Sequence, residues 1–265
     1  MIGSVLLALA LTVEPTPPPL APVGPWIVRA EESMCLLERN YTVDGRRISL
    51  IFQPLLDLPN MEMFIVAADT NDKQYQGNFS AAVASVAMPY TGRYFSVVPP
   101  KAKARLTRLT VQRRLLNELK DGDTLHVRAK PVDQSFTIVR PEKARAALQN
   151  CTNDLKKAWG INDDVASRAE IPPEGKPGHY FGPDAYPREA MQQGIYGRVI
   201  VLLNIDPTGA VSNCRIVSSA GKALNEGTCL AAKRIRFKPA RDKDDKPLPS
   251  TYVLPVRWVL PGSPG

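Results

Sequence analysis

Residues 26–160 carry short segments in which apolar and polar side chains alternate, and turn residues bound these segments. This alternation is typical of β-strands that bury one face. Residues 35–41 and 47–52 flank Asp44-Gly45, which predicts a β-hairpin. Similar patterns predict further strands at residues 61–67, 93–98, 106–111, 125–129 and 135–139. We therefore expect a mostly-β domain over residues 26–160.

Two helices are expected in the same region. Residues 112–119 predict a short helix, and Pro141 suits the first turn of a longer helix over residues 142–158. One face of the longer helix is apolar and carries Ala144, Leu148, Cys151 and Leu155. This face predicts a helix that closes the β domain and carries Cys151 toward the strand that contains Cys35.

A linker and a second domain follow. The linker is expected over residues 161–183, because a Pro- and Gly-rich run within it cannot sustain a helix or a central strand. The second domain, residues 184–261, predicts two helices and three strands. The helices are expected at residues 188–193 and 222–235, and the strands at residues 197–205, 210–217 and 251–260. The expected fold class is α+β.

The strand over residues 197–205 is apolar on both faces at its centre, as a buried central strand would be. Asp206, Pro207 and Gly209 then occupy positions that these residue types favour in a type I turn, so the chain is expected to turn back. The helix over residues 222–235 has one face that would pack on the sheet. That face carries Leu224, Thr228, Ala231 and Ile235.

Pro255 lies in the middle of the last predicted strand. Proline cannot donate a hydrogen bond to a neighbouring strand, so we expect this strand at an edge of the sheet. One side of the strand carries Tyr252, Leu254, Val256 and Trp258. Two interpretations stay open: Pro255 and Arg257 blunt the edge against pairing, or the edge receives an extended peptide. In the second case we expect the Val256 N–H to be an edge donor.

The N-terminus carries an apolar run over residues 4–13 that is too short to span a bilayer as a helix. Its length suits a signal peptide, and Ala8-Leu9-Ala10 fits a cleavage site, although no Lys or Arg precedes the run. We favour a cleaved signal, while an uncleaved anchor and a buried strand stay open. A proline-rich stretch predicts an extended spacer that ends the segment of residues 1–25.

The formal net charge is +8, and the basic residues are scattered without a long Lys/Arg run. This distribution is typical of a basic soluble surface, and we expect no nucleic acid partner. The chain also lacks a Gly-rich phosphate loop, a G-x-S-x-G motif and a histidine near a nucleophile. Asp163-Asp164 and Asp244-Asp245 are most simply turn or surface acids. We therefore expect a non-enzymatic protein with no catalytic residues and no cofactor.

The chain has four cysteines, none of them in a C-x-x-C motif, and His126 and His179 are remote from all four. Metal sites need ligands at closer spacing, so no metal is expected. An even number of cysteines behind an export signal predicts two disulfides. Three pairings are possible. We favour the one that puts a bond in each domain, which joins Cys35 to Cys151 and Cys214 to Cys229.

Several short motifs follow one another over residues 182–261. They contain Tyr186-Pro187, Gly194, Gly197, Asp206-Pro207-Thr208-Gly209, Ser218-Ser219-Ala220-Gly221, Phe237-Lys238-Pro239-Ala240 and Val253-Leu254-Pro255-Val256. In this order and at this spacing, the motifs resemble the C-terminal domain of the TonB family. The resemblance covers under a third of the chain.

The resemblance implies a small periplasmic domain with two helices against a three-stranded antiparallel sheet. It also implies strand pairing with the TonB box of an outer-membrane TonB-dependent transporter, and energy from inner-membrane proton-motive motor proteins. By carry-over, the peptide-binding edge lies within residues 251–259 and includes Tyr252, Val253, Leu254, Val256, Arg257 and Trp258. The pair Cys214 and Cys229 is similar to that of a cysteine-bearing branch of the family.

Energy transducers of this family usually have an N-terminal transmembrane anchor and a long Pro/Lys-rich spacer, whereas this chain begins with a short apolar run and a brief proline stretch. It departs from them in two further places. A folded domain is expected where such transducers usually have a long spacer, and Asn225 stands where the family often has Asp. The first domain resembles periplasmic domains of the invasion-associated locus B type in its strand order and its late Ala-rich helix. Two alternatives to transporter binding therefore stay open: a cell-wall protein that binds peptidoglycan, and a structural protein that homodimerises through its edge strand.

Overall fold

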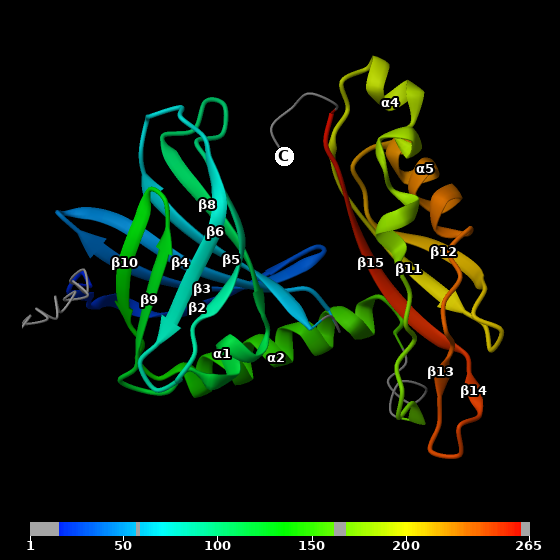
Figure 1. Ribbon diagram of the computed structural model, residues 1–265, viewed down its shortest axis with the longest axis horizontal. Helices are drawn as coiled ribbons and strands as arrows, with labels where there is room; N and C mark the ends of the chain where they lie inside the picture. The colour runs from blue at the N-terminus through cyan, green and yellow to red at the C-terminus, as the bar shows by residue number, and fades with distance from the viewer. Residues whose placement is uncertain (1–15, 57–58, 162–167, 261–265) are drawn as a thin grey trace, which may run out of the picture.

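A computed structural model describes residues 16–56, 59–161 and 168–260 (Figure 1). The predicted signal segment with Ala8-Leu9-Ala10, and the pair Asp163-Asp164, lie outside the described residues. None of the helices in the described part of the chain has the length and apolar content needed to cross a bilayer.

The first domain is built on a ten-stranded sheet. Its strands are β1 (Pro19–Leu20), β2 (Pro22–Glu31), β3 (Met34–Val43), β4 (Arg46–Pro54), β5 (Asn60–Ala68), β6 (Tyr75–Val83), β7 (Tyr90–Val97), β8 (Ala104–Gln112), β9 (Thr124–Ala129) and β10 (Val132–Thr137). All neighbouring strands are antiparallel except β1 and β10, which are parallel.

The sheet closes into a barrel. Its strand order is β1-β10-β9-β6-β7-β8-β5-β4-β3-β2, and the two end strands β1 and β2 are joined in sequence through Ala21 alone. The Tyr41 hydroxyl also donates to the Thr137 carbonyl at 3.2 Å, which links β3 to β10 across the closure. Closure leaves few unpaired edges, so this barrel offers little surface for strand addition.

Three of the barrel strands were not predicted: β1, β2 and β6. β1 (Pro19–Leu20) lies within the predicted proline-rich spacer. β2 begins at Pro22, within the residues that the sequence pattern indicates as spacer, and its two prolines and Gly24 conceal the alternation. β6 (YQGNFSAAV) does alternate, with Phe79, Ala81 and Val83 buried, but its small residues make the apolar face weak. The barrel therefore starts earlier in the chain than the spacer boundary at residue 25 suggests.

Helix α2 (Pro141–Ala158) closes one end of the barrel, as predicted, and α1 (Arg114–Glu118) is the short helix expected after β8. Ala144 and Leu148 are buried in the barrel core, and Leu155 packs against it. Cys151 forms a disulfide with Cys35 of β3, with the Cα atoms 6.1 Å apart. The predicted apolar face of this helix is thus confirmed.

The C-terminal domain has a three-stranded antiparallel sheet in the order β12-β11-β15, with helices on one face (Figure 1). Its elements are α4 (Arg188–Gln192), β11 (Gly197–Ile205), β12 (Val211–Ser218), α5 (Lys222–Ala232), β13 (Ala240–Arg241), β14 (Pro247–Leu248) and β15 (Ser250–Trp258). The whole is mostly β with few helices, so the predicted fold class is confirmed.

The helix-facing core of this domain follows the predicted pattern. Val199, Val201 and Leu203 of β11 point to the helices and are fully buried. The predicted face of α5 meets them, and Leu224, Thr228 and Ala231 are buried. The helix ends at Ala232, earlier than predicted, and Ile235 is buried just beyond its end. The segment before α4 packs on the same domain through 3-10 turns at Pro177–Tyr180 and Pro183–Ala185 and bridges from Ile171 to Arg241 and from Glu174 to Lys238.

The second face of β11 packs against the first domain. Ile200 and Leu202 of β11 and Val253 of β15 form a buried cluster with barrel-side residues. The barrel-side members are Leu56, after β4, and Trp159 and Ile161, at the end of α2. The Arg215 guanidinium donates to the Trp159 carbonyl at the same junction. Both faces of β11 are apolar because the helices of its own domain cover one face and the first domain covers the other.

Trp159→Ala should destabilise the protein, because it empties the centre of this junction. We expect the free energy of unfolding to fall by about 3–5 kcal/mol, the usual cost of truncating a buried aromatic side chain. Urea unfolding of the oxidised protein measures the loss. Leu230→Ala on α5 is the control: Leu230 is 73% exposed, so its loss should change stability by less than about 0.5 kcal/mol. Equal stability of the Trp159 variant and the native chain would contradict the packing described.

Candidate functional site

β15 leaves one edge of the C-terminal sheet open. It pairs with β11 along its whole length, from Gly197 opposite Trp258 to Ile205 opposite Ser250. Within the described residues, no strand pairs with its other side. We call this side the open edge. The prediction that the strand containing Pro255 lies at a sheet edge is confirmed.

Proline reveals which backbone groups face the open edge. Pro255 lies opposite Ile200 and has no N–H, so this pair cannot exchange hydrogen bonds and must be a non-hydrogen-bonded pair. Such pairs alternate with hydrogen-bonded pairs along an antiparallel ladder. Leu254 and Val256 therefore direct their N–H and C=O groups to β11. Thr251, Val253 and Arg257 direct theirs to the open edge.

This register corrects one expectation. The Val256 N–H is not an edge donor, because Val256 lies in a hydrogen-bonded pair with Val199. The strand period of two residues decides which side each backbone group faces, and the sequence alone does not show the phase. The open edge offers the N–H groups of Thr251, Val253 and Arg257, and it has one gap at Pro255.

The side chains of the predicted peptide-binding set divide into three groups. Tyr252, Leu254, Val256 and Trp258 belong to the helix-facing core, where the Tyr252 ring lies 5.0 Å from that of Phe237. Burial of the Tyr252 phenol raises its pKa above the ordinary value. Val253 is buried at the domain junction, and Arg257 is exposed. An added strand would therefore meet β15 mainly through its backbone, with the Arg257 side chain beside it.

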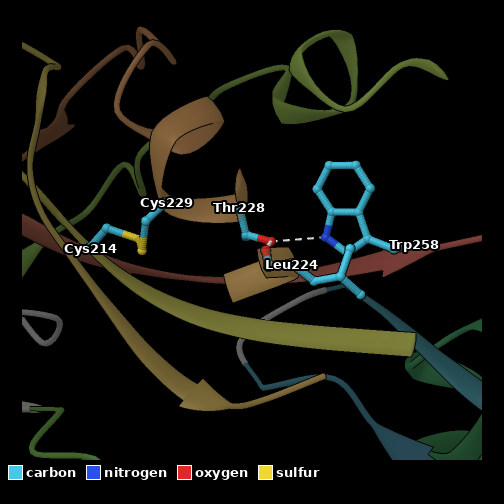
Figure 2. The surroundings of a disulfide bond; sticks show 5 residues. All are labelled: Cys214, Leu224, Thr228, Cys229 and Trp258. Carbon is cyan, nitrogen blue, oxygen red and sulfur yellow. Dashed lines mark hydrogen bonds between the residues drawn. A yellow bond between two sulfur atoms is a disulfide. The ribbon is translucent and has the colours of Figure 1, made fainter. Parts of the chain in front are cut away.

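Trp258 anchors the end of β15 (Figure 2). Its indole N–H donates to the Thr228 hydroxyl at 2.9 Å, and that hydroxyl donates to the Leu224 carbonyl at 2.7 Å. The rings of Phe181 and Tyr186 meet the indole edge to face, with centroids 5.8 Å and 5.3 Å away. This hydrogen-bonded chain ties the edge strand to α5 and limits its movement.

The disulfide Cys214–Cys229 ties the same helix to β12, the other outer strand of the sheet (Figure 2). It joins β12 to α5 with the Cα atoms 5.7 Å apart, and Cys229 follows Thr228 directly in the helix. A bond that closes a loop of this length stabilises a protein by about 3 kcal/mol in the chain-entropy model. Both predicted pairings are confirmed, and no free cysteine is present among the described residues.

The other motif residues shape the turns around this sheet. The Tyr186 hydroxyl donates to the Ile195 carbonyl at 2.6 Å. Pro187 precedes α4, and Gly194, with a φ of 64°, follows its end. A side chain on Gly197 would approach the Ala220 Cβ to 2.9 Å. These contacts place the start of β11 against the loop before α5.

Gly209 has the strictest requirement. It ends the turn after β11 with a φ of 85°, and an added Cβ would lie 1.9 Å from the Phe237 carbonyl oxygen. Its carbonyl accepts the Phe237 N–H at 2.9 Å, and Pro239 packs nearby. In the same turn, Asp206 accepts hydrogen bonds from Thr208 and Ala210, and these bonds lower the pKa of its carboxyl.

Four charged residues that the sequence analysis did not single out lie where the barrel meets the sheet. The Nε atom of Arg108 on β8 lies 3.8 Å from the Glu62 carboxylate on β5. Arg198 of β11 interacts electrostatically with both, and it faces Arg257 across the strands. Burial raises the pKa of Glu62, and the two arginines oppose that shift. Burial also lowers the pKa of Arg198. The available signal for this cluster was Arg198, a charged residue on the strand that the sequence predicts to be buried on both faces.

The two histidines are placed apart from this region. His126 on β9 lies with its Nε2 atom 2.6 Å from the Asp133 carboxylate, and His179 lies in the turn Pro177–Tyr180. Asp244 and Asp245 occupy the turn between β13 and β14. In the described ranges, no three His, Cys, Asp or Glu side chains are grouped so that they could hold a metal ion.

Comparison with known families addresses the same segment. Residues 183–260 match the family described as the Gram-negative bacterial TonB protein C-terminal. This segment is a TonB C-terminal domain. The TonB C-terminal family is a non-catalytic protein-interaction module, and proteins of the TonB family are associated with the cell envelope. Searches of curated proteins and of solved structures found no match.

Proline substitutions at neighbouring positions of this TonB C-terminal domain test the strand register. Val256→Pro removes a hydrogen bond to β11 and leaves a buried carbonyl unpaired, so we expect a loss of about 1–3 kcal/mol in the free energy of unfolding. Arg257→Pro removes only an N–H at the open edge, so it should cost distinctly less. Urea unfolding of both variants measures the difference. The reverse ranking would show that the phase of the ladder is opposite to the one derived.

Thr228→Val should weaken the anchor of the edge strand. The change keeps the shape of the side chain but leaves the buried Trp258 indole N–H without an acceptor, at a cost of about 1–3 kcal/mol. Thr228→Ser is the matched control, because it keeps the hydroxyl. If thermal unfolding ranks the Ser variant below the Val variant, packing of the methyl group outweighs the hydrogen bond.

Proposed function

We propose that this chain is a non-enzymatic periplasmic protein whose TonB C-terminal domain binds an outer-membrane TonB-dependent transporter by β-strand addition. The observation that carries the proposal is the open edge of β15, where unpaired backbone groups of Thr251, Val253 and Arg257 are held in strand geometry. An extended peptide adds to such an edge through main-chain hydrogen bonds. Coupling to inner-membrane proton-motive motor proteins would make the binding a step in transport.

The open edge is better suited to receive a strand than to repel one. Pro255 removes a single donor, and all the outward carbonyl groups remain as acceptors. Both faces of β15 are packed, since Leu254 and Val256 lie in the helix-facing core and Val253 lies in the domain junction. An edge held in this way loses little conformational entropy when a peptide pairs with it, which favours binding.

The two disulfides support a periplasmic location. Both domains contain one, and structural disulfides persist in oxidising compartments such as the bacterial periplasm. The match to the TonB C-terminal family, whose proteins belong to the envelope, agrees with this compartment.

A second candidate function is binding to the cell wall. An open depression of about 460 Å³ beside the segment before α4 is lined by Lys176, His179, Arg236 and Lys238. Such a surface attracts acidic polymers such as peptidoglycan. Glu174 already neutralises Lys238 at 2.8 Å, so this surface favours polymer binding less than the open edge favours a strand. Polymer binding would weaken steeply with added salt, whereas backbone pairing would not.

Photo-cross-linking in the native host tests the proposal. A photo-reactive amino acid at Thr251, which is exposed beside the open edge, should capture an outer-membrane transporter that mass spectrometry then identifies. The same amino acid at Leu230, exposed on α5, should capture none. Capture of a second copy of the chain at Thr251 would support the homodimer alternative. Capture of transporter equally from both positions would contradict strand addition at β15.

A further inference from the structure

A cleft of about 570 Å³ lies between the barrel and the carboxyl end of β15. Arg198 of β11 and Arg257 and Trp258 of β15 line one side of it, and Phe95, Val97 and Leu106 of the barrel line the other. β15 is the strand of the C-terminal sheet on the side of the barrel (Figure 1). The cleft therefore borders the open edge, and residues of both domains enclose it.

The barrel wall of the cleft is apolar. Residues alternate between the two faces of β7. Tyr94 and Ser96 are buried inside the barrel, so Phe95 and Val97 are on its outer face. Leu106 of β8 lies directly opposite Val97. These three side chains form one half-buried patch on the outside of a closed barrel. An apolar patch of this kind beside a strand edge is suited to the side chains of a partner.

The sheet wall of the cleft carries an excess of positive charge. Arg198 and Arg257 lie directly opposite each other on the two strands and point to the same face. Like charges in this position repel each other. Among the residues that the structure describes, the carboxylate that interacts with Arg198 is that of Glu62, which is shared with Arg108. Arg108 and Arg198 thus share one carboxylate, and Arg257 adds a third guanidinium opposite Arg198, so the positive charge on this wall favours another negative charge.

We infer that the cleft is a second half of the peptide site, where the barrel wall and the Arg198–Arg257 pair select an extended partner segment with alternating apolar residues and one carboxylate. The inference rests on the proposed function and adds that the first domain takes part in recognition. A strand beside β15 alternates its side chains between the two faces of the sheet. The side chains on the barrel face contact Phe95, Val97 and Leu106, and the carboxylate lies beside Arg257.

Fluorescence anisotropy with the full oxidised chain tests the inference. The probe is a labelled extended peptide that alternates valine and threonine and carries one central aspartate. The comparison peptide has asparagine at that position. The native chain should bind the aspartate peptide about tenfold more tightly, the usual effect of one charge-assisted hydrogen bond. This preference should decline with added salt, because Arg257 is exposed.

Two variants test the two walls of the cleft separately. Arg257→Gln should reduce the preference for aspartate to near unity, and Arg188→Gln on α4, outside the cleft, is its control. Phe95→Ala should weaken the binding of both peptides about fivefold. Its control is Ile27→Ala, at a partly exposed position of β2. Thermal unfolding of each variant shows whether it is folded, and the Arg257 result does not depend on the barrel variant.

The outcomes separate the inference from the proposed function. If the native chain binds both peptides equally and Phe95→Ala changes neither, strand addition stands and the inference is overturned. If the native chain binds neither peptide, both are overturned for this edge. If the chain dimerises and the dimer excludes the peptide, the cleft accommodates a second copy, and the inference is again wrong.

Discussion

The burial of both faces of β11 is the constraint on which the rest of the structure depends. A strand as apolar as GRVIVLLNI needs a cover on each side, because each exposed aliphatic side chain forgoes about 1.5–3 kcal/mol of burial energy. The helices supply one cover through α5. Trp159 and Ile161 at the end of α2 supply the other. The two domains are therefore coupled through the centre of the smaller sheet. They are placed so that residues at the end of α2 cover the face of this sheet that its own helices leave uncovered.

This placement also determines what β15 can do. One face of the strand is held by Trp258 and its hydrogen bond to Thr228, and the other by Val253 at the domain junction. The free backbone groups of β15 point away from β11, to the side on which no strand of the described residues pairs with β15. A strand held on both faces presents these groups without further ordering, so little conformational entropy is lost when a partner strand pairs with it.

Much of the fold could be predicted from the sequence, and the failures share a physical cause. Periodicity located α2, α5 and most strands, because each buries one regular face. The cysteine positions and Pro255 indicated the disulfides and the edge strand. β1 and β2 were missed because prolines and a glycine conceal the alternation, and β6 was missed because small residues weaken its apolar face. The phase of the β15 ladder and the charges around Glu62 depend on contacts between distant segments, which local patterns do not encode.

Pro255 also bears on which partner the open edge prefers. Two copies that pair through β15 would each bring a proline to the new ladder, so a symmetric pairing lacks two donors. A different partner strand with a complete set of N–H groups lacks only one. Each missing hydrogen bond forgoes about 0.5–1.5 kcal/mol, so the difference is several-fold in affinity. The same residue that marks β15 as an edge therefore favours a strand from another protein over a second copy of this chain.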